Sequence, residues 1–151
     1  MKYDKSQIGW FITALFILVI ISVSVSYVNG YGDKPLSQTA YLSLLILFIF
    51  LILLFYKLRI KVDEQGISVI YGIGIIKFRI QPEKISYVKK TKSPFFYGFG
   101  IRMIPGGMLY NIQGTQSVEV SYFKTKNKLV RIGSADWDNL IAAIKERYQV
   151  N

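Results

Sequence analysis

The stretch IGWFITALFILVIISVSVSYV, residues 8–28, decides the fold class because none of its 21 positions carries a charge. As a helix rising roughly 1.5 Å per residue, it would span the roughly 30 Å hydrocarbon core of a bilayer. A second stretch, LSQTAYLSLLILFIFLILLFY at residues 36–56, is also uncharged and is apolar on every face through Leu44–Phe55. Both stretches therefore predict membrane-spanning helices.

A cleaved signal peptide is the alternative interpretation of the first stretch. This stretch has no A-x-A-like cleavage site, and its apolar run exceeds the roughly 7–15 residues of the apolar region within a signal peptide. The connection Asn29–Pro35 is rich in turn-forming residues and is long enough only for a hairpin. We therefore expect two retained, antiparallel helices that form a hairpin over residues 1–56.

The charges beside the two helices predict their orientation. The connecting loop holds only Lys34 beside Asp33, whereas cations flank the outer ends of the hairpin: Lys2, Lys5, Lys57, Arg59 and Lys61. Cytoplasmic segments carry the excess of Lys and Arg in membrane proteins. The sequence therefore predicts a multi-pass protein of the cytoplasmic membrane with both termini in the cytoplasm.

No Asp, Glu, Lys or Arg lies within either predicted helix. Ion-coupled transporters need such groups at membrane depth, so we expect the hairpin to be an anchor. Small residues spaced four apart predict a close-packed seam between the helices: Ser22, Ser26, Thr39 and Ser43. Self-association through the same faces, giving a homo-oligomer, stays open.

Residues 57–151 differ in character, with 16 Lys or Arg, 7 Asp or Glu and a net charge of +9 over 95 residues. Charged and aliphatic side chains alternate in Lys57–Val62, which is typical of a strand, and Asp63–Gly66 predicts a hairpin turn. Further apolar segments bounded by turn residues complete a predicted meander of about seven antiparallel strands: Ile67–Tyr71, Ile75–Ile80, Ile85–Thr91, Ile101–Ile104, Met108–Ile112, Val118–Phe123 and Leu129–Ile132.

The chain ends in a predicted amphipathic helix with Ser134 as its N-cap. Acidic residues near its start and basic residues near its end match the helix dipole: Asp136, Asp138, Lys145 and Arg147. One apolar stripe is expected to cover the sheet: Trp137, Leu140, Ile141, Ile144 and Tyr148. About seven antiparallel strands capped by one helix predict a mainly-β, pleckstrin-homology-like (PH-like) barrel over residues 57–151.

Several motifs follow one another between residues 58 and 148, namely Pro94–Arg102, Gly107–Asn111, Gly114, Val118–Val120 and Arg131–Gly133. With the terminal helix, this series resembles the small bacterial membrane proteins that carry a PH-like domain. The resemblance implies the fold and supplies no catalytic residues. The first hairpin loop, which is basic in eukaryotic relatives of the fold, is Asp63-Glu64 here, so no phosphoinositide site is expected there.

The aromatic and glycine-rich segment of residues 95–100 has two interpretations. Exposed rings would form a binding lip for a bilayer interface or a partner. Alternatively, the glycines mark a bulge and the rings fill the barrel end, which is the commoner meaning of glycine in a strand pattern. The residues are Phe95, Phe96, Tyr97, Gly98, Phe99 and Gly100. Arg102, Tyr110 and Asn111 either line a polar groove or adopt ordinary surface and packing positions.

Three groups of cations are candidates for contact with anionic lipid, where each cation gains about 1 kcal/mol. Otherwise they form a solvated face and, beside the helices, a topology signal. The groups are Lys57, Arg59 and Lys61; Lys89, Lys90 and Lys92; and Lys124, Lys126 and Lys128. No groove-reading helix or RNP-type aromatic motif accompanies them, so we expect no nucleic-acid partner.

The inventory of reactive side chains argues against an enzyme. The chain has no Cys and no His, which removes thiol nucleophiles and the commonest general base. Most carboxylates fall in turns or at helix ends, and Glu119, in mid-strand, is expected to point outward between Val118 and Val120. Gly72–Gly74 lacks the helix that follows a phosphate-binding loop. We therefore expect no catalytic residue, metal or cofactor.

Together these features predict a membrane-anchored, non-catalytic PH-like module that binds or scaffolds at the cytoplasmic face. The expected partners are the lipid bilayer and another membrane protein. The alternatives are an accessory subunit of a membrane transporter or enzyme complex, and a small enzyme.

Overall fold

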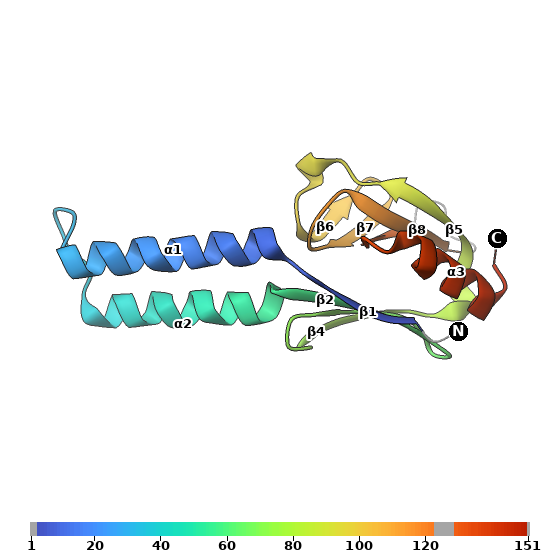
Figure 1. Cartoon of the computed structure of the whole chain (residues 1–151), viewed down its shortest axis with the longest axis horizontal. Helices are drawn as coiled ribbons and strands as arrows, with labels where there is room; N and C mark the ends of the chain where they lie inside the picture. The colour runs from blue at the N-terminus through green and yellow to red at the C-terminus, as the bar shows by residue number, and fades with distance from the viewer. Residues whose placement is uncertain (1–2, 123–128, 151) are drawn as a thin grey trace.

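The computed structural model describes residues 3–122 and 129–150. A hairpin of two long helices projects from one end of a body made of two stacked sheets and a C-terminal helix (Figure 1). The predicted order of two apolar helices followed by a mainly-β part is therefore confirmed for the described residues.

Helices α1 (Trp10–Asn29) and α2 (Gln38–Phe55) form the hairpin. Their 20 and 18 residues are long and apolar enough to cross a membrane. Neither helix has a fully buried residue, so much of their apolar surface stays exposed outside the contacts between the two helices and at the sheet end. Ser37 caps α2 by accepting a hydrogen bond from the Ala40 N–H at 3.3 Å.

The two helices pack through aromatic rings. Tyr27 and Tyr41 stack with centroids 4.3 Å apart, and the hydroxyls of Ser24 and Tyr41 lie 3.2 Å apart. The predicted seam of small residues is wrong, because three of its four members are exposed: Ser22, Thr39 and Ser43. Four-residue spacing marks a stripe along one helix, but only the partner helix decides which stripe is covered.

The first sheet has the order β1-β2-β3-β4 and is antiparallel throughout. Its strands are β1 (Tyr3–Ile8), β2 (Lys57–Asp63), β3 (Gly66–Tyr71) and β4 (Ile76–Ile80). Strand β1 was not predicted, since four of its six residues are polar and its one buried side chain is Tyr3. It precedes the hairpin and pairs with β2, so the sheet includes residues from both sides of the hairpin.

The second sheet has the order β5-β8-β9-β7-β6, with β7 and β9 parallel. Its strands are β5 (Ile85–Lys92), β6 (Gly100–Ile104), β7 (Gly107–Asn111), β8 (Gln116–Tyr122) and β9 (Leu129–Gly133). The prediction of a closed barrel built from a simple meander is wrong, because β9 lies between β7 and β8 and the sheets stay separate. Alternation identifies strands and leaves their partners undetermined.

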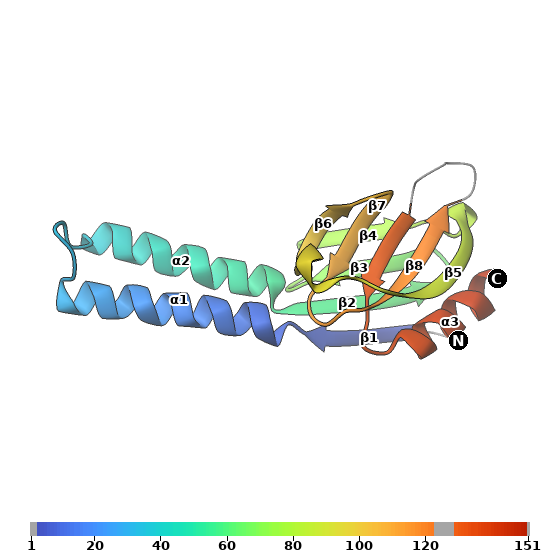
Figure 2. The ribbon, with the colours of Figure 1, turned by 90° about the horizontal axis from the view of Figure 1, so that it is seen from above.

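The core lies between the sheets, whose strands cross at an angle (Figure 2). Helix α3 (Trp137–Tyr148) packs along the side formed by β1 and β5 and buries Leu140 and Ile144. Its predicted apolar stripe is confirmed, but Asp136 takes the N-cap position and Ser134 accepts a hydrogen bond from the Asp136 N–H at 3.2 Å. In the described residues, no helix covers the opposite side, between edge strands β4 and β6.

Candidate functional site

The hairpin is attached to the first sheet by backbone hydrogen bonds. The Gly9 N–H donates to the Tyr56 carbonyl at 2.9 Å, and the Ile73 N–H in the β3–β4 turn donates to the Leu53 carbonyl at 3.1 Å. Gly72 in the same turn has φ +51° and packs directly against the carbonyl oxygens of the last α2 turn, where any Cβ would collide. The junction is therefore a packed contact and not a loose linker.

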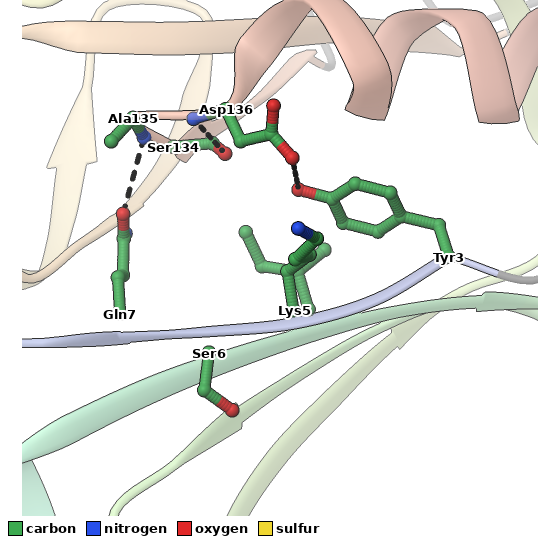
Figure 3. Close-up of a pocket in the computed structure, with 8 residues that line it drawn as sticks. Tyr3, Lys5, Ser6, Gln7, Ser134, Ala135 and Asp136 are labelled. Carbon is green, nitrogen blue, oxygen red and sulfur yellow. Dashed lines mark hydrogen bonds between the residues drawn. The ribbon is translucent and has the colours of Figure 1, made fainter.

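Side-chain hydrogen bonds hold strand β1 against the residues that immediately precede α3 (Figure 3). The Tyr3 hydroxyl donates to Asp136 at 3.4 Å, and Gln7 both donates to the Gly133 carbonyl at 2.7 Å and accepts from the Ala135 N–H at 3.2 Å. Burial is the main cause of the raised pKa of Tyr3. The pocket of about 130 Å³ between these groups is small, and the contacts around it serve to hold β1.

A larger, mainly apolar pocket of about 540 Å³ lies where α1 meets the connection between β5 and β6. Phe99 from the connection packs on Phe11 of α1 with ring centroids 5.4 Å apart, and Phe95 meets Phe99 edge-on at 5.7 Å. The lining residues are Phe11, Ile12, Leu15, Phe16, Phe55, Phe95, Gly98, Phe99, Gly100, Ile101 and Arg102. The aromatic and glycine-rich segment thus forms one wall of this junction pocket.

The segment is a turn with exposed rings. The short helix η2 (Phe95–Tyr97) ends at Gly98, which has φ +71° and ψ −167°. Phe95 and Phe96 are 69% and 81% exposed, so these two rings do not fill the core as the second interpretation required. The start of β6 is held from inside, because the buried Tyr71 hydroxyl donates to the Gly100 carbonyl at 3.1 Å.

Among the residues that the structure describes, Arg102 is the one cation in the lining of the junction pocket. Its Nε donates to the Phe99 carbonyl at 3.2 Å, its guanidinium lies beside Gly98, and it pairs with no carboxylate among the described residues. Tyr110 is buried and stacks on Phe78, and Asn111 is buried at the end of β7, where its side chain donates to the Gly114 carbonyl at 2.9 Å. The three residues therefore do not form a common polar groove.

The juxtamembrane cations differ in their surroundings. Arg59 forms two hydrogen bonds of 2.6 Å with Asp4 of β1, which lower the pKa of that carboxyl group. The Lys57 ammonium lies 5.3 Å from the centre of the Tyr56 ring. Lys61 lies four strand residues beyond Lys57, which is about 13 Å at the usual rise. Lys57 is thus the member of this group nearest to the helix ends.

Two of the three β5 lysines are engaged by carboxylates. Lys89 pairs with Glu119 at 3.1 Å, while Lys90 pairs with Asp138 and lies 5.5 Å from the centre of the Trp137 ring. Lys92 is exposed. The predicted cations Lys2, Lys124, Lys126 and Lys128 lie outside the described residues.

Glu119 lies in a row across the second sheet, between Lys89 on β5 and Arg131 on β9. The alternation with Val118 and Val120 places it on the face away from the core, as expected, but its side chain is only 5% exposed because its two cationic neighbours flank it. Burial raises its pKa, but the hydrogen bonds from Arg131 and Lys89 outweigh burial and leave the pKa lowered. Glu119 is therefore an ionised structural group.

Two contributors to the junction were missed at the level of sequence. Strand β1 carries too few apolar residues to be recognised, and Phe11 and Leu15 look like any other residues of an apolar helix. Phe11 and Leu15 line the pocket only because the fold brings them close to residues 95–102. No family model, curated protein or solved structure matches the chain.

Proposed function

We propose that the chain is a membrane-anchored, non-catalytic binding module of PH-like fold that scaffolds another membrane protein at the cytoplasmic face. The pairing of β1 with β2 carries the proposal. When both helices cross the bilayer, this pairing requires residues 3–8 and 57–63 to lie on the same side. The sheet body is then held against one face of the membrane at a fixed tilt by its junction with the hairpin.

The PH-like assignment is supported by two stacked sheets, mostly antiparallel, with a C-terminal amphipathic helix packed along one open side. Strand β1 and the parallel pair β7 and β9 are additions to the simple meander from which the assignment started. The cytoplasmic side is supported by the flanking cations Lys5 and Lys57, against a nearly neutral connecting loop.

The side of the body opposite α3 is the surface that favours a protein partner. Edge strands β4 and β6 lie there, and neither pairs with a further strand of the described chain. Met103 on β6 is 88% exposed, and unpaired strand edges are ready templates for an added strand. A partner that adds a strand at β6 would gain backbone hydrogen bonds and cover this apolar side chain.

The proposal that the chain is non-catalytic rests on the charge and contacts of Glu119 and on the placement of metal-ligating side chains. Glu119 is held ionised, which does not suit a proton-donating acid, and its two oxygens are engaged by Lys89 and Arg131, which does not suit a nucleophile. Within residues 3–122 and 129–150, no group of three metal-ligating side chains occurs.

The test is co-purification of the full chain from membranes in a mild detergent, with Met103→Glu and Ala142→Glu compared with the unchanged protein. Both variants place the same charge at an exposed position, one on the open edge and the other on the outer face of α3. We expect a membrane-protein partner to co-purify in stoichiometric amounts with the unchanged protein and with Ala142→Glu, and to be lost from Met103→Glu alone. A partner that is itself a transporter or enzyme would make the chain an accessory subunit, and substrate turnover by the purified chain would overturn the proposal.

A further inference from the structure

We propose that the junction pocket binds one phospholipid of the surrounding bilayer, with the phosphate on Arg102 and an acyl chain along Phe11 and Leu15. This inference rests on the membrane insertion in the proposed function, and it names the ligand of the pocket.

The level of the pocket relative to the bilayer follows from the helix ends. Trp10 opens α1 and Tyr56 follows α2, and the hydrogen bond between Gly9 and Tyr56 brings the two ends together. Trp and Tyr residues concentrate at the membrane interface, so these two rings mark its position. The lining residues from Phe11 to Phe16 extend about 8 Å beyond that level at the helical rise. One wall of the pocket therefore lies at the depth of acyl chains.

The opposite wall comes from the sheet body. Phe99 packs on Phe11, which places the tip of the β5–β6 connection at the same depth. The apolar side chains there are open, with Phe11, Leu15 and Phe95 56%, 49% and 69% exposed. The volume of about 540 Å³ falls within the range of small-molecule sites, which runs from roughly 300 to 1,000 Å³. A bilayer lipid reaches such a pocket laterally without leaving the membrane.

The polar end of the pocket selects a phosphate. The guanidinium of Arg102 is oriented by its hydrogen bond to the Phe99 carbonyl, and no carboxylate of the described chain competes for it. The planar guanidinium pairs with phosphate through two parallel hydrogen bonds, which an ammonium group cannot reproduce. A cation at the interface above an apolar pocket matches an anionic phospholipid in both charge and shape.

The test uses the delipidated full chain in a non-ionic detergent, titrated with palmitoyl-oleoyl phosphatidylglycerol and with phosphatidylcholine of the same chains. Native mass spectrometry counts the lipids bound per chain. We expect one phosphatidylglycerol to bind ahead of any further lipid and more tightly than phosphatidylcholine. Arg102→Gln is expected to weaken this first binding step about tenfold, as the loss of a charge-assisted hydrogen-bond pair does.

Two further variants separate a site from general attraction. Lys57→Gln removes an equal charge at the same interface outside the pocket and is expected to leave the first step unchanged. Leu15→Trp fills the apolar part and is expected to weaken the step while Arg102 is intact. Three outcomes would each overturn the inference. The first is an equal effect of Arg102→Gln and Lys57→Gln on the first binding step, and the second is a first binding step that Leu15→Trp leaves unchanged. The third is a polypeptide, instead of a lipid, cross-linked in the pocket. Membrane insertion and partner capture are measured in separate experiments. If both are observed and no lipid binds, only this inference is refuted and the proposed function stands.

Discussion

At the scale of single residues, the contacts of the buried Glu119 carboxylate predict a pH-dependent contribution to the free energy of unfolding. Its carboxylate accepts a hydrogen bond from Arg131 at 2.9 Å and pairs with Lys89 at 3.1 Å. Glu119→Gln should lower the free energy of unfolding by about 1–2 kcal/mol at neutral pH, because the half-exposed Lys89 adds little to the Arg131 contact. The pKa is lowered in the folded state, so this stabilisation is present above the unfolded value of about 4.3 and is lost as pH falls through the folded value. Denaturant titrations of both proteins should therefore converge in acid, and a gap that stays constant would contradict the assignment.

Gly72 gives a second residue-scale prediction. Gly72→Ala adds a Cβ that meets the carbonyl oxygens of Leu53 and Leu54, so the β3–β4 turn must move off the end of α2. Gly74→Ala is the matched control, since it also has positive φ but its nearest neighbour is a side-chain carbon of Ile70 at 3.7 Å. Thermal unfolding in detergent should show a loss of about 1 kcal/mol for the control, typical of backbone strain, and a clearly larger loss for Gly72→Ala. Equal losses would mean that the turn does not pack on the helix.

At the scale of elements, β1 should be needed for full stability of the sheet body. Ile8 and Lys57 are paired in register, so an Asn-Gly turn can join β1 directly to β2 in place of the helices. This soluble chain should resist denaturant better than residues 57–151 alone by at least about 2 kcal/mol, because Tyr3 fills part of the core. Replacing Tyr3 with Ala in the joined chain should remove most of the gain. A fragment of residues 57–151 that is equally stable would make β1 dispensable.

At the scale of the whole molecule, the pairing of β1 with β2 and the cations beside the helices together predict one topology. Since the chain has no native Cys, single replacements of Tyr31 in the hairpin loop, Ser6 on β1 and Lys145 on α3 can be labelled with an impermeant thiol reagent on intact cells. Only the Tyr31 position should be labelled before lysis, because β1 and α3 belong to one body, which the proposed orientation places on the cytoplasmic side. Labelling of Ser6 and Lys145 but not Tyr31 would invert the protein in the membrane. Different accessibility of Ser6 and Lys145 would contradict the pairing of β1 with β2.

The sequence by itself determined the two apolar helices, the turn at Asp63–Gly66 and the amphipathic C-terminal helix, because hydropathy, alternation and helix periodicity are local properties of a chain. Only the tertiary structure decided that β1 joins the sheet across a hairpin of two helices, since its polar residues carry no strand pattern. It also decided that β9 lies between β7 and β8, because alternating strands do not specify their partners. The tertiary structure likewise decided the junction pocket. Phe11 and Phe99 are far apart in sequence, and their rings come into contact only when the helices pack on the sheets.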